Sequence, residues 1–127
     1  WNYLELDRFT RPRSGAFIEV RNGGVPVDYI EITSKLGKKI RITDSYWEYI
    51  TRVKHREMVG LKDAVAKALK LPFEVQRSLK DPSVHLYYGR HEDKLLCVVT
   101  RHLNEEGFII TAYLTRKVGR GQLVWRD

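Results

Sequence analysis

The chain has 127 residues, of which 43% are hydrophobic and 31% charged, a composition typical of one ordinary globular domain. Its 23 Lys and Arg exceed its 16 Asp and Glu, which gives a formal net charge of +7. This surplus favours a polyanionic partner, because binding releases counterions from phosphates; the alternative is a basic protein without such a partner. The single cysteine, Cys97, excludes a disulfide scaffold and argues against a zinc site, and no apolar run is long enough to span a bilayer.

The first third of the chain indicates an irregular arm followed by β-structure. Residues 1–14 show no regular period, whereas 17–20 and 27–32 are strand-like and flank Gly23-Gly24, a good hairpin turn. Residues 39–43 alternate apolar and polar side chains and predict another short strand.

Two helices are predicted next. Thr43 or Asp44 caps the first, Gly60 ends it, and Pro72 stops the second. Their apolar stripes are Tyr46, Tyr49, Ile50 and Val53 in the first helix, and Leu61, Val65, Ala68 and Leu69 in the second.

The remainder of the chain predicts an antiparallel meander. The expected strands are 74–79, 84–88, 95–100 and 108–114, with hairpin turns at 91–94 and 104–107. The fold class is therefore α+β, with two helices packed on an antiparallel sheet of about four strands. An N-terminal arm and β-hairpin extension (1–39) precedes this domain (40–127), unless 1–127 forms one continuous domain.

The expected strand near the C-terminus presents hydroxyl groups on one face. Strand side chains alternate, so Thr111, Tyr113 and Thr115 share a face, and Arg116-Lys117 follow. A tyrosine hydroxyl can donate to a phosphate oxygen or carry a proton, and Thr111 can hold a non-bridging oxygen. Lys117 would bind phosphate. The alternative is the ordinary solvent-facing alternation of an antiparallel sheet.

A histidine lies among charged residues at the end of the first predicted helix. The run is Lys54-His55-Arg56-Glu57, and helical spacing would place Glu48, Thr51 and Arg52 beside His55. Imidazole suits proton transfer near neutrality, Lys54 and Arg56 could bind the scissile phosphate, and Glu57 could orient the ring. The alternative is a solvated helix face.

A third cluster is Tyr87-Tyr88-Gly89-Arg90-His91. Arg90 could clamp a phosphate bidentately. One of the two tyrosines must face away from the core, and we take Tyr88 as an RNA-facing group. His85 and His102 are minor candidates, the first as an exposed or core histidine and the second in a loop.

The order of these motifs resembles the barnase, EndoU, colicin-tRNase and RelE-like ribonuclease superfamily, in its phage and polymorphic-toxin branch. The resemblance rests on the following residues from about Ile40 to Trp125: Trp47, 54–58, 71–75, Leu86-Tyr87-Tyr88-Gly89-Arg90, Ile109-Ile110-Thr111-Ala112-Tyr113 and Trp125. It implies metal-independent RNases, many of them toxins, that leave a cyclic phosphate. It further implies acid/base chemistry at His55, sheet-face catalysis by Thr111 and Tyr113, and phosphate binding by Lys54, Arg90 and Lys117.

Three functions remain open from the sequence. The leading one is a cytoplasmic RNA endonuclease, needing no cofactor or metal, with RNA (tRNA among the candidates) and a cognate antitoxin or immunity protein as partners. The second is a non-catalytic RNA- or protein-binding module on the same fold. The third is an enzyme acting on a small phosphorylated substrate.

Overall fold

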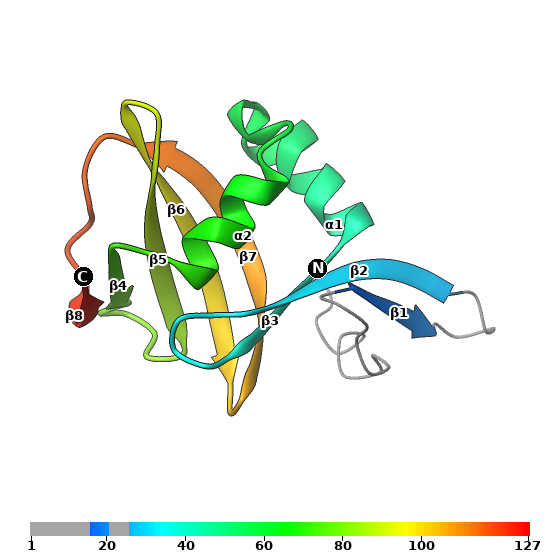
Figure 1. Cartoon of the computed structure of the whole chain (residues 1–127), viewed down its shortest axis with the longest axis horizontal. Helices are drawn as coiled ribbons and strands as arrows, with labels where there is room; N and C mark the ends of the chain where they lie inside the picture. The colour runs from blue at the N-terminus through cyan, green and yellow to red at the C-terminus, as the bar shows by residue number, and fades with distance from the viewer. Residues whose placement is uncertain (1–15, 21–25) are drawn as a thin grey trace.

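The computed structural model describes residues 16–20 and 26–127, which form one mixed sheet with helices on one face (Figure 1). The strand order is β1-β2-β3-β7-β6-β5-β4-β8. The helical elements are α1 (Asp44–Tyr49), η2 (Ile50–Lys54), η3 (Arg56–Met58) and α2 (Lys62–Lys70). The strands are β1 (Ala16–Val20), β2 (Pro26–Thr33), β3 (Lys39–Thr43), β4 (Glu74–Arg77), β5 (Val84–His91), β6 (Lys94–Leu103), β7 (Glu106–Thr115) and β8 (Gln122–Arg126).

The α+β class is confirmed, but the expected sheet was too small. The described chain contributes eight strands rather than about four, and β3 pairs with β7 in parallel, so the sheet is not purely antiparallel. The N-terminal hairpin is part of this sheet rather than an extension, because β2 pairs with β3. The division into 1–39 and 40–127 remains a prediction, and the expected arm at 1–14 lies outside the described residues.

The hydrophobic core lies between the sheet and the helices. Alternate strand residues face α2, among them Val75, Tyr87, Val98 and Ala112, and all are buried. The predicted stripe of α2 is confirmed at Val65, Ala68 and Leu69, each at most 3% exposed. A Cβ at Gly89 would lie 2.9 Å from the Ala68 Cβ, so only glycine lets α2 approach β5 this closely.

The first helix departs from α-geometry in its second half. Thr43 caps it as predicted, accepting a hydrogen bond from the Tyr46 amide at 3.1 Å. From Ile50 onward the helix widens into a π-turn, in which the His55 amide donates to the Ile50 carbonyl at 2.8 Å. The wider turn changes the angular spacing of side chains, so Val53 is 65% exposed and its expected burial was wrong.

His55 is therefore not a helical residue. Its φ of −142° and ψ of 87° place it in a break between η2 and η3. The expectation that Glu48, Thr51 and Arg52 would surround its ring by helical spacing was wrong for the same reason. The break instead lets the chain turn toward the sheet, where η3 contacts β7.

Only the first three residues of one edge of β7 are paired with β3, and the helical segment lies beside the rest of that edge. β3 pairs with β7 at residues 106–108 alone, after which the two strands diverge. Tyr46 Oη donates to the Ile110 carbonyl at 2.6 Å, satisfying a backbone acceptor beyond the last β3 partner. This contact fixes the first helix beside the second half of β7.

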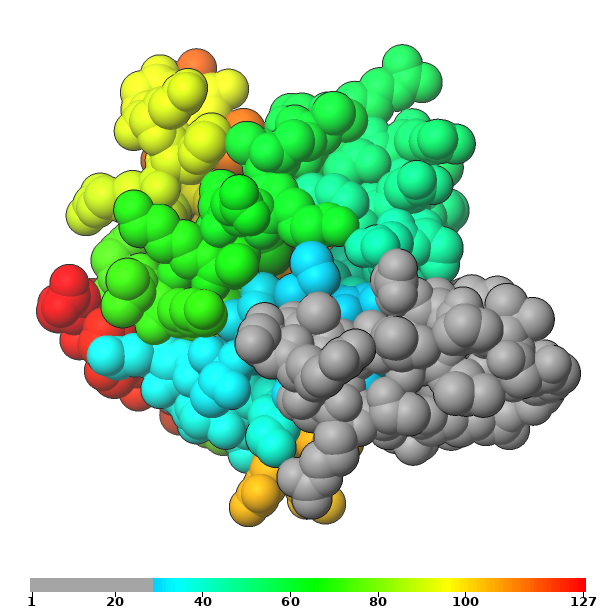
Figure 2. Space-filling model, turned by 45° about the vertical axis from the view of Figure 1, so that its right-hand side comes forward, coloured from blue at the N-terminus to red at the C-terminus, as the bar shows by residue number. Residues whose placement is uncertain are grey.

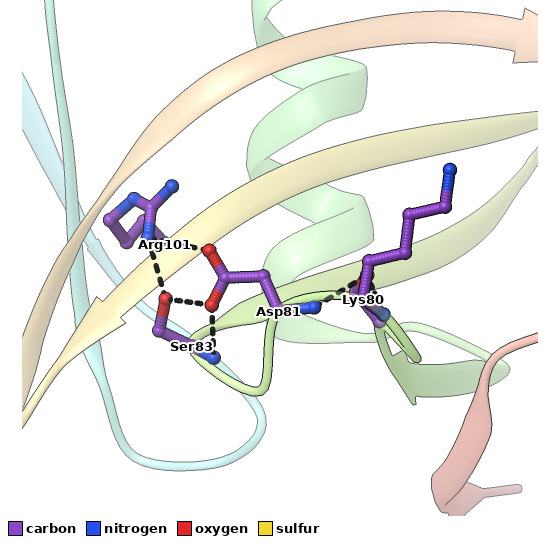
Figure 3. A network of polar contacts seen from close by, with 5 residues as sticks. Lys80, Asp81, Ser83 and Arg101 are labelled. Atoms are coloured by element: carbon purple, nitrogen blue, oxygen red, sulfur yellow. Dashed lines mark hydrogen bonds and ion pairs between the residues drawn. The ribbon is translucent and has the colours of Figure 1, made fainter.

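The connection between β4 and β5 is held by a polar network (Figure 3). Arg101 Nη1 donates to Asp81 Oδ2 at 2.9 Å and to Ser83 Oγ at 2.7 Å. The Ser83 amide and hydroxyl donate to Asp81 Oδ1, and together with Arg101 they lower the pKa of Asp81. The network ties the connection to β6.

No helix in the described ranges is long and apolar enough to cross a membrane.

Candidate functional site

The break at His55 brings its ring against Tyr113 of β7. The ring centroids lie 5.5 Å apart with an interplanar angle of 37°. His55 Nδ1 lies 3.5 Å from Glu57 Oε2, within ion-pair distance but longer than a good hydrogen bond. The His55 side chain is 32% exposed, so a ligand could reach it. Three of the predicted site residues therefore meet at one place.

Tyr113 belongs to the sheet face opposite the helices, here called the helix-free face. The predicted alternation holds, since Ala112 lies in the core on the other side. Cross-strand pairing places Cys97 between Tyr113 and Tyr88, and the buried Cys97 sulfur interacts electrostatically with both tyrosine side chains. Tyr88, like Tyr113, thus faces away from the helices, as the sequence required of one tyrosine of the pair, but it is only 1% exposed.

Burial keeps the side chains of Tyr88, Cys97 and Tyr113 protonated. It raises the pKa of Tyr88 to about 12 and that of the Cys97 thiol to about 11, and it raises the pKa of Tyr113 well above its ordinary value of 10. The Cys97 sulfur adds to the rise at Tyr113, because an ionised sulfur would repel a phenolate. All three groups are therefore protonated at neutral pH, and Tyr113 can donate a proton but cannot serve as a base.

Thr111 lies on the helix-free face two residues before Tyr113. Its Oγ1 is buried, yet it has no hydrogen-bond partner among the described residues. Buried hydroxyls are normally paired, and leaving one unpaired costs about 1–3 kcal/mol. Because Oγ1 is buried, a ligand oxygen could reach this hydroxyl only if neighbouring side chains moved.

The lysines and arginines expected to bind phosphate do not all gather around the His55–Tyr113 pair. Lys54 Nζ lies 3.5 Å from Tyr46 Oη and 5.7 Å from the ring centroid of Tyr49, so it packs along the first helix. Arg56 is exposed on η3, next to His55. Lys117 is exposed in the connection between β7 and β8.

Arg90 occupies a different concavity. Its guanidinium lies 4.6 Å from the ring centroid of Phe73, in a groove of about 480 Å³ between α2 and the end of β5. Figure 2 shows the tip of the β5–β6 hairpin standing apart from the helical segment. Neither His55 nor Tyr113 lines this groove, so Arg90 is not brought to the His55–Tyr113 pair.

Sequence reasoning undervalued a pair of histidines on the helix-covered face. The rings of His85 and His102 stack at 3.8 Å and 5°, and His102 Nε2 lies 3.1 Å from the Tyr87 hydroxyl. Burial lowers the pKa of both, that of His102 to about 3. His102 was expected in a loop, but β6 continues to Leu103. The signal was available, because His85 and Tyr87 alternate onto one face of β5.

The chain matches no protein-family profile, no curated protein and no solved structure. Among the described residues there is no group of three or more His, Cys, Asp or Glu side chains able to hold a metal ion.

Proposed function

We propose that this chain is a metal-independent RNA endonuclease that cleaves by attack of the 2′-hydroxyl and leaves a cyclic phosphate. The observation that carries the proposal is the His55–Tyr113 pair, which lies beside the unpaired buried hydroxyl of Thr111. The pair combines a group that can accept a proton with a group that stays protonated, which is what general acid–base cleavage of RNA needs.

The roles follow from protonation state. His55 takes the 2′-hydroxyl proton as the 2′-oxygen attacks phosphorus. Tyr113 then protonates the 5′-oxygen as the bond between phosphorus and that oxygen breaks, because its raised pKa keeps the phenol neutral. Thr111 donates its hydroxyl hydrogen to a non-bridging oxygen, and Glu57 holds the imidazole once it is charged.

The cations divide into near and distant groups. Arg56 adjoins His55, and Lys54 and Lys117 can swing from their exposed positions toward the scissile phosphate. Arg90 lies in the groove with Phe73 and would bind a phosphate further along the strand. Tyr88 is buried, and its role is to support Tyr113 through Cys97 rather than to contact RNA.

The proposal extends to the wider setting of the molecule. The resemblance to the barnase, EndoU, colicin-tRNase and RelE-like superfamily supports a toxin or toxin-like effector acting in the cytoplasm on RNA, with tRNA a candidate target. Such an activity would call for a cognate antitoxin or immunity protein.

A non-catalytic RNA-binding module is the second candidate. It is favoured by the burial of the Tyr113 side chain, which raises the pKa of Tyr113 and so makes the group proposed as the acid a weaker proton donor. The same basic surface would then bind RNA without cutting it. Substituting His55 would leave RNA binding unchanged in that case.

The test is incubation of purified chain with total RNA in EDTA, comparing wild type with His55→Ala and Tyr113→Phe. Lys80→Ala serves as a control, because Lys80 is exposed in the connection between β4 and β5 and belongs to neither the His55–Tyr113 pair nor the Arg90 groove. We expect wild type and the control to cut, and the two site variants to lose about 100-fold or more in rate. Intact RNA with every folded protein, together with a gel shift, would favour the binding module.

A further inference from the structure

The connection between β7 and β8, residues 116–121, crosses the helix-free face and is here called the strap. β7 and β8 are separated in the sheet by β6, β5 and β4, so the connection must pass three strands (Figure 1). It passes them on the helix-free face, since Gly119 contacts Tyr88 and Gly121 contacts Gln76. The strap begins directly after Thr115, two residues beyond Tyr113.

Three hydrogen bonds from buried side chains hold the strap in place. Gln76 Nε2 donates to the Gly119 carbonyl at 3.1 Å, and Gln76 Oε1 accepts from the Gly121 amide at 2.9 Å. Tyr88 Oη accepts from the Gly119 amide at 2.9 Å. Gln76 is itself oriented by Glu74, whose Oε2 accepts from Nε2 at 2.5 Å. The amide nitrogen and the amide oxygen of buried Gln76 both bond to the strap backbone, so they hold the strap at one position over the sheet.

Of the two glycines of the strap, Gly121 is required by this close approach. A Cβ at Gly121 would lie 2.7 Å from Gln76 Oε1 and 2.8 Å from the Arg77 carbonyl oxygen, and the latter belongs to rigid backbone. A Cβ at Gly119 would lie 3.1 Å from Tyr88 Oη. The strap can therefore approach the backbone of β4 this closely only because position 121 lacks a side chain, whereas a side chain at Gly119 would require only a small shift of Tyr88.

The strap carries positive charge and no carboxylate. Arg116, Lys117 and Arg120 are exposed, and none of them forms an ion pair within the described part of the chain. Their backbone is fixed to the sheet, so three cations are presented without the entropy cost of ordering a free loop. Gly119 of the strap hydrogen-bonds Tyr88, and the cross-strand pairing of Tyr88 with Cys97 and of Cys97 with Tyr113 connects the strap to the proposed site.

We propose that the strap is the surface that binds the phosphate backbone of single-stranded RNA, and that Gln76 is its positioning residue. The proposal rests on the RNase function above. A single strand is favoured over a duplex because the neighbouring His55 and Tyr113 rings offer a stacking surface that only unstacked bases can use.

The test measures binding of a fluorescent 2′-O-methyl 12-mer, which cannot be cut because it lacks the attacking hydroxyl. The variant Arg116→Gln/Lys117→Gln/Arg120→Gln should reduce the slope of log affinity against log salt by about 2, and affinity at 0.15 M salt by about fiftyfold. The control Lys70→Gln/Lys80→Gln/Lys94→Gln removes the same charge elsewhere and should lose about threefold or less, since screening limits distant charges. Equal losses in the two triple variants would overturn the proposal.

Gln76→Leu tests the positioning without changing charge. We expect faster trypsin cleavage within the strap and about fivefold weaker 12-mer binding, with Gly121→Ala behaving alike if Gln76→Leu fails to fold. A strap that trypsin cuts faster but that binds the 12-mer as wild type does would overturn the role of Gln76. A duplex bound more tightly than the single strand would overturn the choice of ligand.

The probe also separates the two proposals. If wild type cuts no RNA but the strap variant alone loses the 12-mer, the RNase function fails and the strap stands as a binding surface. If wild type cuts RNA and the strap variant binds and cuts normally, the strap proposal fails and the RNase function stands.

Discussion

The two faces of the central part of the sheet are covered by different elements, one by the apolar side of α2 and the other by the polar strap. On the helix-covered face, Val75, Val98 and Ala112 pack against apolar residues of α2. On the helix-free face, Gln76 and Tyr88 hydrogen-bond Gly119 of the strap, which also carries three cations. Cys97 and then Tyr113 follow Tyr88 across the neighbouring strands on the same face. The first face needs only apolar contact to be stable, whereas the second keeps polar groups at fixed positions. The difference separates an apolar face that stabilises the fold from a polar face to which we assign the proposed function.

The largest effect should come from the helix-covered face. Leu96→Ala removes a side chain that is 1% exposed and should lower the free energy of unfolding by about 2–5 kcal/mol, because it leaves a cavity in the core. Urea unfolding followed by circular dichroism measures this. A loss below about 1 kcal/mol would mean that the core beneath α2 is not tightly packed.

The stacked histidines should make this face sensitive to acid. Burial lowers the pKa of His102 from 6.5 to about 3 and also lowers that of His85, so the unfolded chain binds more protons below pH 6.5. Stability is therefore complete above pH 6.5 and falls as the pH drops toward 3, by up to about 1.4 kcal/mol per pH unit for each histidine.

Unfolding free energies at pH 7.5, 6.0 and 5.0 check this slope. In His102→Gln the decline between pH 6.5 and 5 should be shallower than in wild type, whereas His91→Ala should keep it. An unchanged slope in His102→Gln would show that this histidine is not held neutral.

On the helix-free face, Thr111→Val should separate stability from function. Valine has nearly the shape of threonine, so it removes an unpaired buried hydroxyl and should raise the unfolding free energy by about 1 kcal/mol or more. RNA cleavage should fall at the same time, because the contact to a non-bridging oxygen is lost. Lower stability in this variant would show that the Thr111 hydroxyl has a hydrogen-bond partner in the folded state and is not free to bind a ligand.

The smallest effect is expected at the β4–β5 connection. Arg101→Gln removes the ion pair with the solvent-exposed Asp81 carboxylate and should lower the free energy of unfolding by less than any of the variants above changes it. The loss should diminish in 1 M NaCl, because salt screens such pairs. A loss that is large and independent of salt would show that Arg101 acts by packing instead.

Regular periodicity made part of this structure predictable. The alternation of residues 111–115 correctly placed Thr111 and Tyr113 on one face, and the stripe of α2 was found at Val65, Ala68 and Leu69. These elements follow their local period because each has one buried side.

The remainder depended on long-range contacts. Nothing local marks the π-turn that removes His55 from the helix. Strand β8 was missed because Leu123 and Val124 are exposed and the strand pairs only with β4. The role of Gln76 was equally hidden, since its partners lie more than 40 positions away along the chain. Candidate residues could thus be named from the sequence, but their grouping required the fold.

The most direct test of a functional helix-free face is the chemistry of the ends that the protein leaves on RNA. Wild-type chain should be incubated with total RNA in EDTA and the fragments analysed for terminal phosphates. We expect wild-type chain to produce fragments with 2′,3′-cyclic phosphate and 5′-hydroxyl ends, and we expect none of these fragments from the His55→Ala variant. Fragments ending in 5′-phosphate, or no fragments beyond those in a protein-free control, would contradict it.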